Sequence, residues 1–126
     1  MVLIFGATLG LASVFFGAFV EHGLNENITS YQIDALETAI RYNQVNAVLI
    51  SAVGLALLNG GKLARICIIR WSATFLIIGT ILFCFGIYLA VFLESPNLSK
   101  ITPIGGLAII VAWVLLLIGG IVGRRP

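Results

Sequence analysis

Residues 71–93 read WSATFLIIGTILFCFGIYLAVFL and contain no charged residue. An α-helix rises about 1.5 Å per residue, so about 20 mainly apolar residues are needed to cross the hydrocarbon core of a bilayer, which is about 30 Å thick. This stretch satisfies both conditions. It therefore predicts a transmembrane helix and indicates that lipid, rather than water, surrounds most of the chain.

Three further stretches predict membrane spans, at about residues 2–20, 42–60 and 102–122. The first carries no charge, and the last follows directly after Lys100 and Ile101. The 42–60 span is the weakest, because its apolar part holds eight Leu, Ile, Val and Phe residues against thirteen in the 71–93 span. Such residues drive insertion, so we expect this span to enter the membrane with help from its neighbours.

The composition supports a membrane protein over the whole chain. Of its 126 residues, 60% are hydrophobic and 10% are charged, which a soluble domain of this size could not accommodate. The net charge of +2 is too small for a nucleic-acid-binding surface. Cys67 and Cys84 lack the spacing of a metal site or a disulfide framework. We therefore predict a single all-α membrane domain over residues 1–126, folded as a compact four-transmembrane-helix bundle in the lipid bilayer.

The basic residues predict the orientation of these spans. Two of the seven, Arg41 and Lys100, lie in the loops after the first and third spans. The other five lie between the second and third spans or at the C-terminus: Lys62, Arg65, Arg70, Arg124 and Arg125. Because cytoplasmic loops carry the excess of Lys and Arg, both termini are predicted to be cytoplasmic in a multi-pass topology.

Small residues recur at helical spacing in every span. They allow close approach of helix backbones, which is the main source of helix association in lipid. The interval of three to four residues places them on one face of each helix. The predicted packing glycines are Gly6, Gly10, Gly17, Gly79, Gly86, Gly105, Gly119 and Gly123. The same stripes favour a homo-oligomer or a larger membrane-protein partner.

A helix is also predicted within the first outer loop, at about residues 30–41. Thr29 suits the N-cap, and Gln32 stands at the third helical position, as in a capping box. Glu37 and Arg41 have the i, i+4 spacing of an ion pair. We expect this helix to lie on the outer membrane surface. No helix breaker separates it from the 42–60 span, so it is left open whether the two are continuous.

The predicted topology gathers polar side chains at the outer ends of the spans. The candidate cluster comprises Glu21, His22, Arg41, Tyr42, Gln44, Asn46, Tyr88 and Thr102. One interpretation is a hydrogen-bonded network that anchors the weak second span, because unpaired polar groups are costly in hydrocarbon. The other is a small outward-facing cavity in which Glu21 and His22 exchange protons.

No enzymatic chemistry is predicted. His22 is the sole histidine, so a site of several histidines is impossible, and we expect neither a metal nor a cofactor. The serines and threonines have no histidine or carboxylate at a predictable distance, which leaves no basis for a catalytic triad.

Several motifs resemble a known family. They are GAFVEHGL at 17–24, YNQ at 42–44, GTILF at 79–83 and TPIGG at 102–106 with Trp113. Together they resemble the bacterial family called domain of unknown function 423, which is similar to the eukaryotic transmembrane protein 256. The resemblance spans nearly the whole chain. It implies a four-helix protein of the bacterial inner membrane, with no established activity.

Two departures from the family pattern bear on the cluster. The family usually has Gly-Ala-His where this chain has Val20, Glu21 and His22, and it commonly has a second histidine at the position of Asn46. A hydrogen-bonding role survives a change from histidine to asparagine, whereas metal ligation and proton relay do not. The departure at Asn46 therefore favours a structural role.

Three functions follow as hypotheses. The first is a structural or accessory membrane component that packs against itself or larger partners. The second is a transporter or channel subunit for a small solute or proton, acting through the outward-facing polar cavity. The third is binding of a lipid or a quinone-like ligand near Trp113 and Tyr88.

Overall fold

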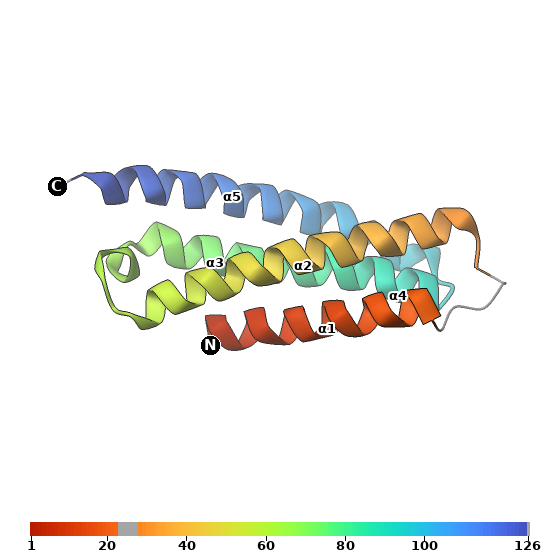
Figure 1. The fold of residues 1–126 in the computed structure, drawn as a ribbon. Coiled ribbons are helices and arrows are strands. Elements are labelled where there is room, and N and C mark those ends of the chain that lie inside the picture. Colours follow the sequence, from red (N-terminus) through yellow and green to blue (C-terminus); the bar gives the residue numbers. More distant parts are fainter. Residues whose placement is uncertain (23–27, 126) are drawn as a thin grey trace.

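A computed structural model of the chain describes residues 1–22 and 28–125, and all its regular elements within those ranges are helices (Figure 1). Gly23 and Leu24 of the first family motif lie outside the described residues. The elements are α1 (Val2–His22), α2 (Ser30–Leu58), η1 (Lys62–Arg65), α3 (Cys67–Thr80), η2 (Ile81–Phe85), α4 (Gly86–Phe92), η3 (Pro96–Ile101) and α5 (Thr102–Arg124).

Three helical stretches are long and apolar enough to cross a membrane: Val2–His22, Cys67–Phe92 and Asn97–Arg124. They overlap the spans predicted at 2–20, 71–93 and 102–122, and the all-helical fold is thereby confirmed. The helix α2 is longer, at 29 residues, but is not among these three within the part of the chain that the structure describes.

The helix α2 begins where the sequence predicts. The Thr29 Oγ1 accepts a hydrogen bond from the Gln32 backbone N–H at 3.2 Å, and Gln32 Oε1 accepts one from the Thr29 N–H at 3.1 Å. The helix then continues without a break to Leu58. Residues 30–41 and the helical part of 42–60 therefore form one element rather than two, because nothing between them interrupts the backbone hydrogen bonds.

The helices α1 and α2 form an antiparallel hairpin with very close backbone contact. A Cβ atom added to Gly54 would lie 2.6 Å from the backbone N of Leu3, so the two helices meet where a side chain has no room. The hairpin keeps one register along its length: Gly6 faces Ser51, Gly10 faces Ala47, Gly17 faces Ile40 and Gly54 faces Leu3.

The stretch α3–η2–α4 forms a second antiparallel hairpin with α5. A Cβ on Gly79 would lie 2.9 Å from the carbonyl oxygen of Gly105. Ser72 Oγ donates a hydrogen bond of 2.8 Å to the carbonyl of Ala112, which ties the helices near their middle. Further contacts in this hairpin and beside it join Gly86 to Thr102, Gly105 to Phe83, Gly119 to Ile69 and Gly123 to Ile66. All eight predicted packing glycines thus lie against a neighbouring segment, as their spacing indicates.

The core lies where α2 meets α3 and α4. One buried cluster there joins α2 to the second hairpin through Leu36, Ala39, Ile40, Cys84 and Tyr88. Figure 1 shows α1 and α5 on opposite sides of the layer formed by α2 and α3, and no extensive contact joins them within the described residues. The helices α1 and α5 therefore lie at opposite edges of the helix bundle.

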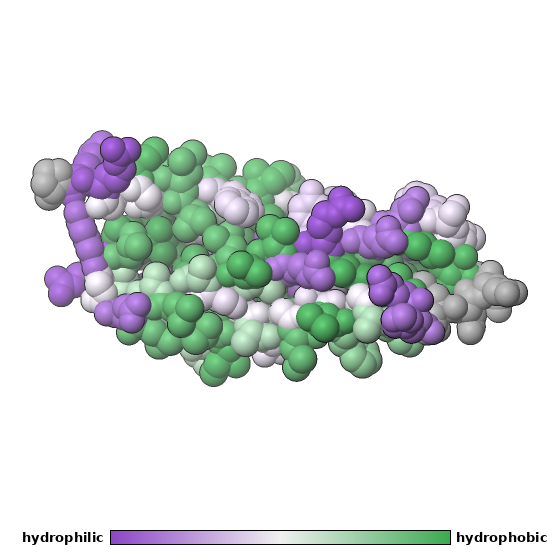
Figure 2. Space-filling model, in the orientation of Figure 1, coloured by the Kyte–Doolittle hydropathy of each residue, from purple (hydrophilic) through white to green (hydrophobic). Residues whose placement is uncertain are grey.

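The surface has three kinds of region (Figure 2). Hydrophobic side chains cover most of the visible face, and hydrophilic ones gather at both ends and in a band over α2. The chain termini and η1 lie toward the same end of the molecule in Figure 1. There the Lys62 ammonium donates a hydrogen bond to the carbonyl of Arg125. The connection 93–101 lies at the opposite end.

Candidate functional site

The predicted polar cluster divides into a buried part and an exposed part. Asn46 and Tyr88 are both 1% exposed, in the interface between α2 and the second hairpin. Asn43, which is completely buried beside them, donates a hydrogen bond from Nδ2 to the Tyr88 hydroxyl at 3.3 Å. We call the buried residues Asn43, Asn46, Thr80 and Tyr88 the polar seam.

All four side chains are buried, and two of them, Asn43 and Tyr88, are hydrogen-bonded to each other. Asn43 and Asn46 are three residues apart on α2, so they lie on the same face. Thr80 and Tyr88 lie eight residues apart and flank the π-helical turn η2, which keeps both in the buried face. Tyr88 is held by stacking on Phe16 of α1, with ring centroids 4.1 Å apart. The seam therefore joins α1, α2 and the second hairpin.

Several seam atoms have unused hydrogen-bonding capacity. Asn43 Oδ1, Asn46 Nδ2 and Thr80 Oγ1 are buried without a hydrogen-bond partner among the described residues. An unsatisfied buried polar group costs about 1–3 kcal/mol. The seam can thus bind polar groups in addition to holding the hairpins together, but it contains no carboxylate, imidazole or amine.

Thr102 lies apart from the seam, in the second hairpin. Its Oγ1 atom is also without a partner among the described residues, and it lies close to Gly86. Thr102 therefore packs between α4 and α5 and has no hydrogen bond to Asn46 or Tyr88.

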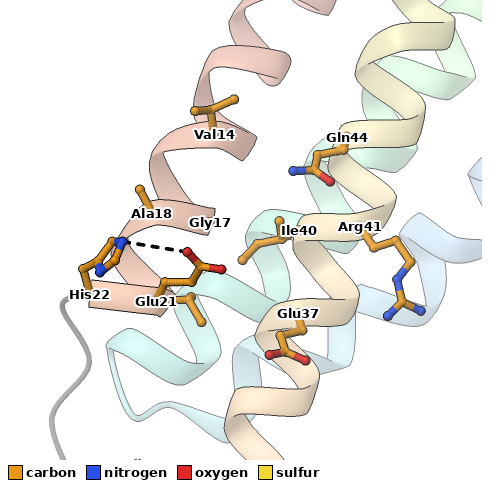
Figure 3. Close-up of a pocket in the computed structure, with 10 residues that line it drawn as sticks. Val14, Gly17, Ala18, Glu21, His22, Glu37, Ile40, Arg41 and Gln44 are labelled. Atoms are coloured by element: carbon orange, nitrogen blue, oxygen red, sulfur yellow. Dashed lines mark ion pairs between the residues drawn. The ribbon is translucent and has the colours of Figure 1, made fainter.

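The exposed part of the cluster lines a groove of about 550 Å³ between α1 and α2 (Figure 3). Figure 3 shows Glu21 reaching toward α2 and Gln44 pointing toward α1. His22 Nε2 lies 3.8 Å from Glu21 Oε2, but both side chains are about 80% exposed, which makes this a weak ion pair even when the histidine is protonated. The groove is lined by Val14, Gly17, Ala18, Val20, Glu21, His22, Glu37, Ile40, Arg41 and Gln44.

The predicted ion pair between Glu37 and Arg41 does not form. The described residues contain a single ion pair, which joins His22 and Glu21. Figure 3 shows the Arg41 guanidinium pointing away from α1, so only the stem of this side chain borders the groove. The spacing permits the pair, but both side chains are exposed, and solvent offers them equally good partners.

Two aromatic residues lie outside both regions. Tyr42 is exposed and packs edge-on against Phe83, with ring centroids 5.1 Å apart. Trp113 is 45% exposed on α5, whereas Tyr88 is 1% exposed in the seam. The two residues proposed to border a lipid or quinone therefore differ in exposure, with Trp113 at the surface and Tyr88 in the interior.

Sequence reasoning missed Asn43 and Thr80 as members of the candidate site. Asn43 has a detectable pattern, because it shares a helical face with Asn46 and with the apolar residues Ile40 and Ala47. Thr80 has no comparable pattern among the apolar residues around it. Residues 1–22 and 28–125 hold no group of three His, Cys, Asp or Glu side chains placed to share a metal ion.

Comparison with known proteins now places the chain in a family. The family described as protein of unknown function DUF423 matches residues 16–106. A UPF0382 membrane protein of Haemophilus influenzae is 31% identical over 113 residues, which cover 90% of this chain and 87% of that protein. The UPF0382 inner membrane protein YgdD of Escherichia coli K12 is 30% identical over 124 residues, which cover 98% of this chain and 91% of YgdD.

A Gram-positive relative extends the comparison. The UPF0382 membrane protein SAB0533 of Staphylococcus aureus is 32% identical over 118 residues, which cover 92% of this chain and 91% of that protein. No solved structure matches the chain. With most of its length matched by these membrane proteins and its middle matched by the family, this chain is an integral membrane protein that belongs to the DUF423 family.

Proposed function

We propose that this protein is a structural or accessory component of the bacterial inner membrane, with four spans and both termini in the cytoplasm. The single observation that carries the proposal is the polar seam. Its amides, threonine and tyrosine are buried, and its hydrogen bond between Asn43 and Tyr88 joins the two hairpins, while the outward faces of α1 and α5 carry exposed apolar residues. Such a molecule presents packing surfaces rather than reactive groups.

The register of the first hairpin supports α2 as the fourth span. Leu3 faces Gly54 and Gly17 faces Ile40, so α2 runs beside α1 over nearly the whole length of α1. Because α1 is apolar enough to cross the membrane, α2 crosses at the same depths. The first turns of α2 extend beyond the end of α1 and supply the interfacial segment expected at the outer surface.

Site-specific photocrosslinking in native membranes tests the accessory role. A photoreactive residue at Leu117, which is 65% exposed on α5, is expected to capture a second copy or another membrane protein reproducibly. The matched control carries the probe at Ala112, which is completely buried on the same helix, and should react only within the chain. Capture of lipid alone at Leu117, together with a monomeric protein after mild extraction, would contradict the proposal.

A second candidate, transport of a small solute or proton, is favoured by the groove between α1 and α2. Glu21 and His22 lie at its mouth, where they can exchange protons with water. Proton or cation flux into liposomes that contain the purified protein would test this candidate. We expect E21Q and H22A to reduce any such flux, and equal flux in both variants and the parent protein would exclude this pathway.

A further inference from the structure

The groove between α1 and α2 has two chemically different halves. The half away from the mouth is mainly apolar and includes Val14, Ala18 and Ile40, with Gly17 leaving space between the helices and Gln44 as its one polar side chain. Its mouth carries Glu21, His22 and Glu37 from the two helices. At about 550 Å³ the groove falls within the range of about 300–1,000 Å³ that is typical of small-molecule sites.

The mouth of the groove carries two carboxylates without a strong cationic partner. Glu37 forms no ion pair among the described residues, and Glu21 has only the exposed His22 at 3.8 Å. The guanidinium of Arg41 points away from the groove in Figure 3. The charge here is therefore negative, although two of the ten lining residues, His22 and Arg41, belong to basic types.

The two halves lie at different depths. The apolar half is bordered by the last turns of α1, one of the helices able to cross a membrane. The carboxylate of Glu21 lies at the end of that helix, where hydrocarbon gives way to the headgroup region. A ligand with an apolar tail and a cationic head would place its tail against the apolar half of the groove and its head beside the Glu21 carboxylate.

We infer that this groove binds an amphiphile with a primary ammonium head and an apolar tail. An ammonium group donates three hydrogen bonds, so it can bind Glu21 and Glu37 together through charge-assisted hydrogen bonds. The tail covers the apolar wall formed by Val14, Ala18 and Ile40. This chemistry has two sources, an aminophospholipid of the bilayer or a free lipophilic amine. The inference does not depend on the accessory role.

Native mass spectrometry of the full-length protein in mixed micelles tests the inference. The probes are phosphatidylethanolamine and phosphatidylcholine with identical acyl chains, because the quaternary head of phosphatidylcholine has no N–H donor. We expect phosphatidylethanolamine to be retained about tenfold more, which is the effect of one charge-assisted hydrogen bond. Dodecylamine is the soluble probe, and its binding in place of the phospholipid would identify the free amine as the source. Equal retention of the two phospholipids with no binding of dodecylamine overturns the inference.

Matched variants locate the binding to this groove. The E37Q and E21Q substitutions keep the shape of each side chain and should each remove most of the preference for the ammonium head. The control is D34N, because Asp34 is an exposed carboxylate of the same helix that does not line the groove. An unchanged preference in both glutamine variants, or an equal loss in D34N, overturns the assignment.

A second variant tests the apolar half independently. The substitution A18F places a ring in the apolar wall and should weaken both phospholipids equally, because it removes space for the tail rather than the partner of the head. Circular dichroism checks that the helix content is retained, and if A18F does not fold, the two glutamine variants decide the question. Full retention of both phospholipids by a folded A18F protein also overturns the inference.

Discussion

At the scale of the residue, the fold depends on glycines whose neighbours cannot move away. At Gly54 the nearest atoms to an added Cβ belong to the backbone of Leu3, at 2.6 and 2.8 Å. Backbone atoms in a helix do not shift as a flexible side chain does, so a single methyl group at this position must separate α1 from α2.

The first prediction compares two identical substitutions in helices. We expect G54A to destabilise the protein by about 1–3 kcal/mol, because it overpacks the hairpin. We expect G120A to be neutral or to stabilise by up to about 1 kcal/mol, because alanine is the better helix former and nothing lies within 4 Å of that position. Unfolding in detergent with increasing SDS, followed by circular dichroism, measures both. Equal stability of the two variants would contradict the close contact between α1 and α2 at Gly54.

The second prediction concerns the hydrogen bond between Asn43 and Tyr88. Removal of the hydroxyl in Y88F leaves the buried Nδ2 of Asn43 without its partner and should cost about 1–2 kcal/mol. The double variant N43L/Y88F removes both polar groups and should recover part of that loss. The same unfolding assay gives the coupling energy, and strictly additive effects would mean that the bond contributes nothing.

At this scale, the sequence predicts which polar residues gather near the ends of the spans better than it predicts which way each side chain faces. Asn46 and Tyr88 are both expected in the polar cluster, and both side chains are buried. Gln44 and Arg41 come from the same helical turns but face outward, into or beside the groove. Their directions depend on which face of α2 meets α4, and tertiary packing decides this.

At the scale of the element, α2 shows how a local motif defines one end of a helix. In the capping box, the backbone N–H groups of Thr29 and Gln32 each donate a hydrogen bond to the side chain of the other residue, and the helix starts there as predicted. The far end has its own signal, because Asn59 is the C-cap and Gly60 follows it with a positive φ of 66°, the left-handed conformation that ends many helices. The π-helical turn η2 has no counterpart in the sequence pattern, because its residues are ordinary helix-compatible apolar ones.

The third prediction tests the cap. The substitution T29A removes the acceptor for the Gln32 N–H and should cost about 1 kcal/mol. Because the bond is local, the loss should appear as faster hydrogen exchange at the first turn of α2, with the transmembrane part unaffected. S30A is the control, since Ser30 is exposed and its hydroxyl caps no backbone group. Equal exchange in the two variants would assign the start of the helix to something other than its cap.

At the scale of the whole molecule, the protein consists of two hairpins joined at Gly60 and Gly61. Neither glycine would bring a Cβ within 4 Å of another atom, so this link is unpacked. The closest backbone contacts lie within each hairpin, whereas side chains of the core and the polar seam join the two. Hydropathy predicts the apolar helices well, but the order in which they pack has no linear pattern, because it depends on which helix faces contact each other.

The fourth prediction divides the molecule at this link. Co-expressed fragments 1–60 and 61–126 should assemble in the membrane and co-purify, because each fragment retains one complete hairpin. A division after Gly79, within the second hairpin, is the control and should give little complex, since it separates α3 from η2 and α4. Failure of the first pair to assemble would show that the hairpins do not form independently.

The close contact of Gly6 and Gly54 with the opposite helix also bears on how the protein is made. The ribosome synthesises α1 before α2, and α2 is the helix with the lowest hydropathy of the long four. When α2 leaves the ribosome, α1 is already in the membrane, and its glycine positions allow α2 to pack closely against it. We therefore expect the protein to insert hairpin by hairpin, with the earlier helix of each pair providing the packing surface for the later one.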